Sequence, residues 1–438
     1  MNSRSRPERI YTLNNMSRYW AVNPGAVERL PIAECHASTS EIPPSLKYVV
    51  LPDWAAQWGV NGVLCIPVYA ITEGGGAEWQ RVDWLEAAFW YLQGCGERAF
   101  ENAHGPIHSY SFRLTGWDSR VWERAWVNRI ALFLRAWAAR QAESSEDRLF
   151  GPLPEAEWIF THDVDAVRKT WPIRFKQLAF QTYNAGRNCL QGKVGRALDR
   201  LTHAAQFLLG GDDYWRFEEL VALEEAAGVR SHFNFYGGAG GWARTAMQIF
   251  LDPDYDVLEP QVRDLIKNLS QLGYRIGVHS SFYSWNAPEQ LQSEKERVER
   301  ALEGATTVCR NHWLRFSWKD AWETQQAVGF QMDTTLGFND RSGFRVGAAL
   351  PIHPWAPDKR QPMEILSLPM VIMDSHVYDY QDLDDPAREA QLSFWLEEVR
   401  QVKGVATLIW HPHALSADYG WSPGLRYILN QTPSLAVR

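Results

Sequence analysis

The sequence predicts an α/β fold whose larger part is a seven-stranded (β/α) barrel. From Trp158 onward, short apolar runs alternate with segments of helical apolar spacing, and this alternation implies parallel strands joined by right-handed crossovers. Each apolar run also ends at, or close before, a polar or titratable residue, as barrel strands do at one rim. The expected strands lie near residues 158–161, 231–236, 275–279, 306–309, 330–333, 364–374 and 405–410.

Helix signals separate these strands. A helix opens at Asp385-Pro386, with Pro in the first turn where it is preferred, and ends at Gly404. Capping residues bound two more helices, at 317–329 and 286–304. The stretch 166–230 is too long for one crossover, so we expect a helical insertion there, with helices over 171–190 and 194–209.

Residues 1–150 do not continue this alternation of strand and helix. Their pattern predicts a smaller N-terminal α+β domain. Strands are expected at 48–51 and 62–69, and helices at 84–92 and 122–141. The polar stretch 141–147 is a plausible linker. A chain of 438 residues exceeds the size at which one core usually stops growing. The sequence therefore predicts two domains, 1–150 and 151–438, with no role assigned to the first.

Composition narrows the class of protein. The 45% hydrophobic and 22% charged residues are an ordinary globular balance, and a net charge of −8 without a long basic stretch argues against a nucleic-acid partner. Residues 1–30 lack an apolar segment of signal-peptide length, and no run approaches the roughly 20 apolar residues of a membrane span. Five scattered Cys without a CxxC pair fit reduced thiols. We expect a cytoplasmic protein, with homo-oligomer formation left open.

The 22 Trp residues are unusual. Indole faces stack on sugar rings, which hints at carbohydrate, but most Trp side chains are expected in the core because aromatic residues carry large burial energies.

Two aspartates follow the first barrel strand. Asp163 and Asp165 are two residues apart, so they share a face if the strand continues through them. Two carboxylates at such a short separation repel each other, and a bound divalent cation usually offsets this repulsion. One Asp would then bind the metal and the other could take a proton. The alternative is a turn in which Asp is merely common, or a cap of the next helix.

Imidazoles and arginines follow later strands. His279 comes at a strand end, where a neutral imidazole is a natural metal ligand, although a structural role is equally plausible. His312 lies between Arg310 and Arg315, which could hold a carboxylate, bind an anionic substrate or form surface salt bridges. Other polar residues follow the remaining strands: Asp333, Asp374, His411 and His413. So many at one rim indicate an enzyme.

These motifs carry a resemblance to a known family. The stretch 158–413 resembles the polysaccharide deacetylases of carbohydrate esterase family 4, in particular the bacterial branch whose first motif is Thr-His-Asp-Val-Asp. The matching runs, in order, are 161–165, 277–281, 310–316, 333–338, 343–345 and 410–411. The resemblance implies a distorted seven-stranded barrel that removes N- or O-acetyl groups from sugars with a divalent metal, often zinc.

The resemblance also implies roles for single residues. Asp163 would be the general base, oriented by Arg310, and His411 the general acid, oriented by Asp333. Metal ligands would be Asp165 and His279. The family's usual second histidine is missing near Tyr283 and Ser284, so we hypothesise His312 as the third ligand. The expected substrate contacts are Ser281, Trp313 and Arg315.

The predicted function is a metal-dependent hydrolase that removes acetyl groups from an acetylated carbohydrate. Three alternatives stay open. One is a catalytically inactive carbohydrate-binding component of a polysaccharide pathway, and another is an amide hydrolase acting on a non-sugar substrate. The third is a glycosidase with Asp163 and either Asp333 or Asp374 as its carboxylate pair.

Overall fold

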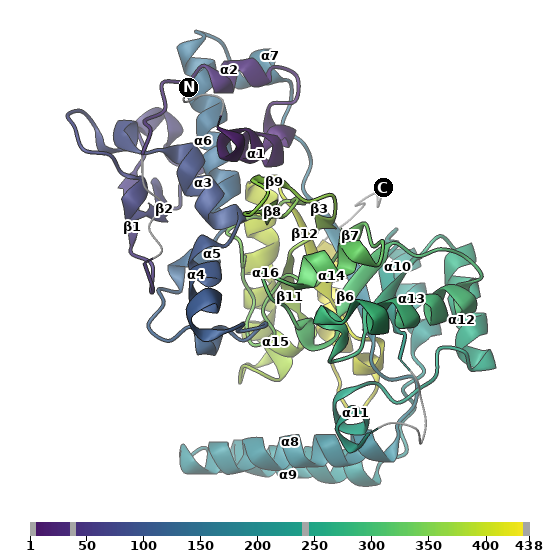
Figure 1. Cartoon of the computed structure of the whole chain (residues 1–438). Coiled ribbons are helices and arrows are strands. Elements are labelled where there is room, and N and C mark those ends of the chain that lie inside the picture. The colour runs from purple at the N-terminus through teal and green to yellow at the C-terminus, as the bar shows by residue number, and fades with distance from the viewer. Residues whose placement is uncertain (1–5, 36–40, 239–244, 432–438) are drawn as a thin grey trace. The chain divides into compact units, whose positions relative to one another are not determined.

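The computed structural model describes residues 6–35, 41–238 and 245–431, and Figure 1 shows its elements. The chain forms two compact units. The first comprises residues 1–159 and 313–408, and the second comprises 160–312 and 409–438. The expected boundary near residue 150 therefore differs from the compact units, and it stays a prediction.

The central sheet confirms the predicted α/β class but has eight strands instead of seven. Its order is β10-β7-β6-β5-β4-β3-β12-β11. The extra strand arises because the expected strand at 364–374 is split into β10 (Leu366–Ser367) and β11 (Met370–Met373). These two short strands stand at opposite ends of the strand order.

Two residues between β10 and β11 bring the edges of the sheet together. Only Leu368 and Pro369 separate the two strands, so the edges lie within about 11 Å of each other. The Leu368 N–H donates to the carbonyl of Asp333 in β7 (Met332–Asp333) at 2.8 Å. The Pro369 carbonyl accepts from the N–H of Thr407 in β12 (Val405–Ile409) at 3.2 Å. The sheet thus curls into a nearly closed barrel.

Four strands of the second unit pair in chain order: β3 (Glu157–Val164, which starts in the first unit), β4 (His232–Tyr236), β5 (Arg275–Ser280) and β6 (Val308–Asn311). All three pairings are parallel. Their register sets Asp163 opposite Asn234, Asn234 opposite Gly277, and His279 opposite Arg310. Because the strands run the same way, their carboxyl ends meet at one rim and bring these side chains together.

Amphipathic helices cover this part of the sheet. In α12 (Pro260–Gln271) the buried residues are Val262, Leu265, Ile266 and Leu269, the spacing of a single apolar stripe. The helix α13 (Pro288–Leu302) buries its own stripe and ends at Glu303, which adopts a left-handed backbone. The second unit also contains α10 (Phe217–Ala226), α11 (Ala246–Leu251) and α17 (Ser422–Gln431).

The helical insertion is confirmed with its predicted bounds. It consists of α8 (Trp171–Leu190) and α9 (Val194–Leu209), which pack side by side as a hairpin (Figure 1). Within the described ranges, no helix is long and apolar enough to cross a bilayer.

The first unit joins the N-terminal third of the chain to the later barrel strands. It contains the antiparallel pair β1 (Leu46–Val50) and β2 (Val63–Pro67), the helices α3 (Trp84–Leu92) and α6 (Trp126–Gln141), and the later helices α14 (Ala321–Ala327) and α16 (Asp385–Gln401). Buried ion pairs connect the two segments. Arg129 of α6 lies 2.7 Å from Glu398 of α16, and Arg345 lies 2.8 Å from Glu97. Burying these charges is tolerable only because they are paired and hydrogen-bonded.

Candidate metal centre

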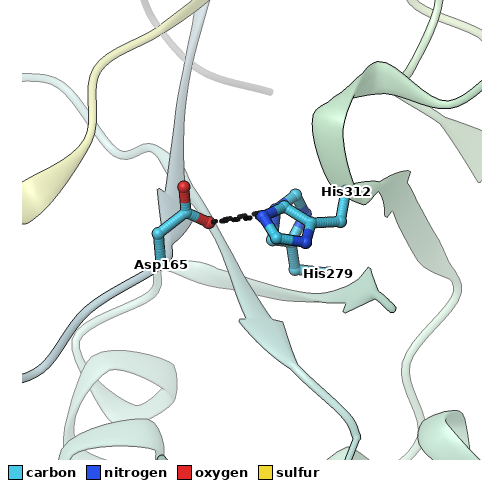
Figure 2. Close-up of side chains that lie close together, drawn as sticks. All are labelled: Asp165, His279 and His312. Atoms are coloured by element: carbon cyan, nitrogen blue, oxygen red, sulfur yellow. Dashed lines mark ion pairs between the residues drawn. The ribbon is translucent and has the colours of Figure 1, made fainter. Parts of the chain in front are cut away.

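Three side chains converge at the rim of the second unit. Asp165 follows β3, His279 lies in β5 and His312 follows β6. The Oδ1 atom of Asp165 is 3.2 Å from Nε2 of His279 and 3.7 Å from Nε2 of His312, and the three ligand atoms all lie within 4.8 Å of one another. Figure 2 shows the carboxylate facing both imidazoles. Ligands of a tetrahedral zinc stand about 3.3 Å apart, so the cluster has the dimensions of a metal site.

Hydrogen bonds fix the orientation of both imidazoles. His279 Nδ1 is 3.1 Å from the carbonyl oxygen of Arg310, and His312 Nδ1 is 3.3 Å from Oδ1 of Asp252. Both partners are acceptors, so each Nδ1 carries a proton. Each Nε2 faces Asp165 and is the atom that the neutral imidazole offers to a cation. This is the arrangement of histidines that bind a metal through Nε2.

The charges of the cluster also suit a cation. Burial by itself would raise the pKa of Asp165, but the neighbouring imidazoles of His279, His312 and His411 outweigh it and hold that pKa well below its usual range. Burial lowers the pKa of His312, which favours the neutral imidazole that a metal requires. For His279, burial is outweighed by Asp163 and Asp165, so its pKa is raised.

The residues present fit a divalent metal. Oδ1 of Asp165 is shielded from solvent, and among the described residues its polar neighbours are the ion-pair contacts to His279 and His312. One carboxylate and two imidazoles are the donor set of many catalytic zinc sites, and other divalent ions accept it as well.

A second carboxylate lies beside this cluster and is held by two donors. Oδ1 of Asp163 accepts from Asn234 Nδ2 at 2.9 Å and from Arg310 Nη1 at 3.1 Å. Arg310 is fully buried and also donates to Thr161 Oγ1 at 2.7 Å. Burial alone would raise the pKa of Asp163, but Arg310 and His279 outweigh it and lower that pKa. Asp163 is therefore an ionised carboxylate whose Oδ2 accepts no hydrogen bond from the described residues.

The register of the strands explains why residue 277 is a glycine. A Cβ at this position would lie 2.3 Å from Oδ1 of Asn234, the residue that supports Asp163. We expect Gly277→Ala to displace Asn234 and to lower the free energy of unfolding by about 1–3 kcal/mol, measured by urea denaturation. Gly186→Ala in α8 is the control, because a Cβ there meets nothing within 4 Å. Equal stability of both variants would contradict this packing.

His411 also lies beside Asp165. Its Nε2 is 3.6 Å from Oδ2 of Asp165, and the side chain keeps partial contact with solvent. The ring lies 5.5 Å from that of His413, which packs against Tyr214 and Tyr419. His411 is thus placed where it could exchange a proton at the site, whereas His413 is enclosed by aromatic rings.

Four residues that the sequence analysis assigned to the site lie outside the cluster described above. Asp333 belongs to the first unit, where its carboxylate accepts from Trp322 Nε1, Gln325 Nε2, the Thr335 N–H and Ser367 Oγ at 2.9–3.1 Å. These bonds give Asp333 a structural reason for its burial, and its action on His411 stays a prediction. Trp313 and Arg315 also belong to the first unit, and their substrate contacts stay predictions.

Ser281, the fourth of these residues, belongs to a buried hydrogen-bond network. Its N–H donates to Glu294 Oε2 at 3.0 Å, and its hydroxyl bonds to the same carboxylate, to Ser284 and to Gln290. The network fixes the turn that follows β5. Burial raises the pKa of Glu294. A substrate contact by the Ser281 side chain stays a prediction.

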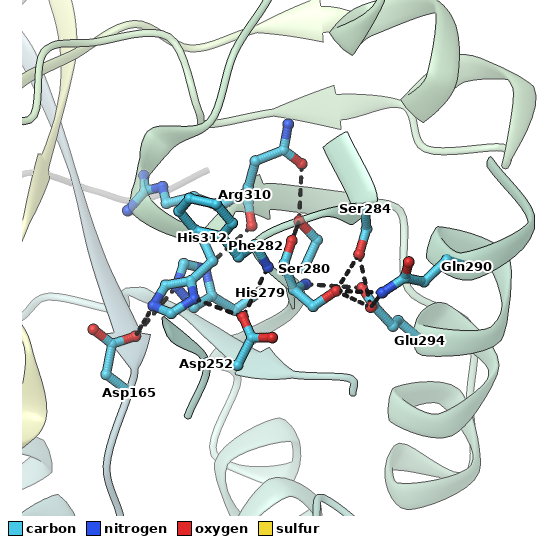
Figure 3. Close-up of polar contacts among 12 residues, drawn as sticks. Asp165, Asp252, His279, Ser280, Phe282, Ser284, Gln290, Glu294, Arg310 and His312 are labelled. Atoms are coloured by element: carbon cyan, nitrogen blue, oxygen red, sulfur yellow. Dashed lines mark hydrogen bonds and ion pairs between the residues drawn. The ribbon is translucent and has the colours of Figure 1, made fainter. Parts of the chain in front are cut away.

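Two polar residues at the site were missed by sequence reasoning. Asn234 lies in strand β4, whose other four residues are all aromatic, and a lone amide in such a run is the signal that could have identified it. Asp252 follows α11 in a loop, where Asp is common, and only the Asp-Pro-Asp run 252–254 sets it apart. Figure 3 shows Asp252 between His312 and the backbone of Phe282, whose N–H donates to it at 2.8 Å.

Asp252 should matter for metal affinity. Replacing it by Asn removes the charge that holds the Nδ1 proton of His312 but keeps the shape. We expect Asp252→Asn to weaken metal binding by about 10–100-fold, measured by titration with a competing chelator. Asp254→Asn is the control, since Asp254 lines the same cavity but lies outside the cluster. Unchanged affinity in Asp252→Asn would contradict the supporting role.

The cluster opens into a cavity of the second unit. Its lining includes Asp165, Lys176, Phe250, Asp252, His312 and Tyr419. Burial lowers the pKa of Lys176, although Asp165 and Asp252 act in the opposite direction.

Comparison with known proteins gives similarity to solved structures only. No protein-family model and no curated protein matches the sequence. A Mycobacterium smegmatis protein assigned as a polysaccharide deacetylase is 15% identical, with a TM-score of 0.38 over 65% of this chain and 87% of its own. The Xyl-CE4 domain of a multidomain xylanase from the hindgut metagenome of Trinervitermes trinervoides is 7% identical, with a TM-score of 0.31 over 64% and 86%. Puue allantoinase is 9% identical, with a TM-score of 0.35 over 63% and 83%. Likeness at this level carries no argument about activity, which rests on the site itself.

Proposed function

We propose that this protein is a divalent-metal-dependent hydrolase, with zinc favoured, that removes acetyl groups from an acetylated carbohydrate. The observation that carries the proposal is the pairing of two functions at one rim. Asp165, His279 and His312 form a donor set whose histidines are oriented for a metal, and Asp163 lies next to them as a separately held carboxylate. The carbohydrate as substrate rests on the sequence motifs that resemble the deacetylase family.

Each residue has a task that follows from its contacts. Asp165, His279 and His312 would hold a divalent cation, which would supply Lewis-acid polarisation of the acetyl carbonyl and acidify water. Asp163 takes the proton of the attacking water on Oδ2, because Asn234 and Arg310 occupy Oδ1. His411 gives a proton to the leaving nitrogen or oxygen of the sugar, and acetate is released.

The first test is metal content, measured by elemental mass spectrometry on protein purified without a metal-affinity tag. We expect about one divalent ion per chain, lost in Asp165→Ala and kept in Asp254→Ala. Acetate release from acetylated sugars should follow the metal through removal and reconstitution. A protein that takes up no metal would overturn the proposal, and hydrolysis of a glycosidic bond without metal would favour a glycosidase.

A further inference from the structure

The α8–α9 hairpin turns its apolar side chains to solvent. Large apolar residues are exposed along both helices: Trp171, Phe175, Tyr183 and Leu190 in α8, and Val194, Leu198, Leu201 and Leu209 in α9. In α9 they recur at steps of three or four residues with Ala205 among them, so they form one continuous stripe. Such a stripe normally packs against a core, and here the described residues of this chain leave it exposed.

The buried face of the hairpin has the opposite character. In α8 the buried residues include Gln181, Asn184 and Asn188, and within the described residues of both helices Phe207 is the one large apolar side chain that is buried. A helical pair that served only to extend the core would bury its apolar stripes and expose its amides. The hairpin is amphipathic in the inverse sense, which indicates an apolar surface outside the chain.

The hairpin is also basic in an acidic protein. Between Trp171 and Leu209 there are six Lys and Arg residues and one Asp, a net charge of +5, whereas the whole chain carries −8. Two copies of the hairpin would repel each other if their apolar faces met. Three of these cations, Arg187, Lys193 and Arg196, are exposed. Exposed cations beside exposed aromatic and aliphatic side chains are the composition of helices that lie on anionic membranes.

Both features are strongest at the turn of the hairpin. Leu190 and Val194 bracket the turn with 92% and 64% exposure. Arg187, Lys193 and Arg196 lie around them and are exposed as well. An apolar tip surrounded by cations can enter the headgroup region while its charges stay with lipid phosphates.

We infer that the α8–α9 hairpin docks this protein onto the surface of an anionic lipid bilayer, with the apolar stripes of both helices in the headgroup boundary. The base of α8 contributes Ile173 and Lys176 to the cavity of the metal centre, and α11 adds Phe250, an exposed side chain, next to them. Docking through the hairpin therefore places the mouth of this cavity near the membrane. The inference does not depend on the proposed hydrolase activity.

The test is binding of the full chain to phosphatidylglycerol vesicles in a co-sedimentation assay, with phosphatidylcholine vesicles beside them. We expect binding to the anionic vesicles that weakens as salt is raised. Leu190→Ser with Val194→Ser should weaken it by at least about tenfold. Arg187→Gln, Lys193→Gln and Arg196→Gln together should weaken it by about 100-fold, at about fivefold per cation.

Matched controls separate docking from general surface hydrophobicity. Val22→Ser with Val50→Ser removes two apolar side chains of similar exposure from the first unit, 76% and 67%, and should leave vesicle binding unchanged. Asp163→Asn should also bind normally, which distinguishes docking from catalysis. Absence of binding to anionic vesicles would overturn the inference. So would a dimer in light scattering that the Leu190→Ser and Val194→Ser variant dissociates, because a second copy would then cover the stripe.

Discussion

Asp163→Asn is expected to lower the rate of acetate release by about 10²–10⁴-fold and to leave the bound metal in place. The substitution is nearly isosteric. The amide oxygen of the new side chain can still accept from Asn234 and Arg310, as Oδ1 of Asp163 does now. What is lost is Oδ2, the oxygen that accepts no hydrogen bond from the described residues and that can take a proton.

Asp163 is ionised at neutral pH, so the wild-type protein carries the base that Asp163→Asn removes. Burial would raise its pKa, but Arg310 and His279 outweigh burial and lower it. A carboxylate with a lowered pKa stays ionised until the pH falls through that lowered value, so the base is fully present above the usual carboxyl range. Loss of activity on the acid side should therefore come from groups that titrate at higher pH than Asp163.

The measurement is the turnover rate together with metal content for each variant. Asp254→Asn makes the same chemical change in the lining of the same cavity, outside the donor cluster, and should keep activity close to wild type. If Asp163→Asn kept both its metal and near-normal turnover, Asp163 would not be the base. If it lost its metal, Asp163 would belong to the metal site.

Much of this site could be predicted from the polar residues that follow apolar runs in the sequence. Parallel strands bring their carboxyl-terminal residues to one rim, so these side chains were expected to lie together. Asp163, Asp165, His279, Arg310, His312 and His411 were all expected there, and the second unit brings them together. A position at a strand end does not reveal which groups the side chain bonds to. Asp333 satisfies it equally well, yet Trp322 and Gln325, one turn apart on α14, occupy its carboxylate.

Other features could not be inferred from the strand pattern. Asp252 comes from a loop, so its contact with His312 depends on how α11 is placed in three dimensions. The support of Asp163 by Asn234 depends on strand register, which a single sequence does not reveal. The apolar run 364–374 looked like one strand, but Leu368 and Pro369 interrupt it where the chain passes from one edge of the sheet to the other.

His312→Ala is expected to weaken metal binding by at least about 100-fold, more than the loss of a supporting hydrogen bond would cost. The family that the sequence resembles has a second histidine near the position of Tyr283, and this chain does not. Here His312 enters from the end of β6, with Nε2 3.7 Å from Asp165 Oδ1 and Nδ1 held by Asp252. Catalytic zinc sites normally need three protein ligands, so removing His312 should leave only Asp165 and His279.

The control for His312→Ala is His413→Ala, which removes an imidazole that lines the same cavity but lies outside the donor cluster. Its metal content should match that of the wild type, since His413 packs against Tyr214 and Tyr419. Metal content by elemental mass spectrometry and the absorption spectrum of the cobalt-substituted protein together report the number of ligands. An unchanged cobalt spectrum in His312→Ala would show that another group completes the site, and the histidine missing near Tyr283 would then be replaced by something other than His312. Loss of metal in His312→Ala, with retention in His413→Ala, would mean that His312, at the end of β6, supplies the third ligand of this site.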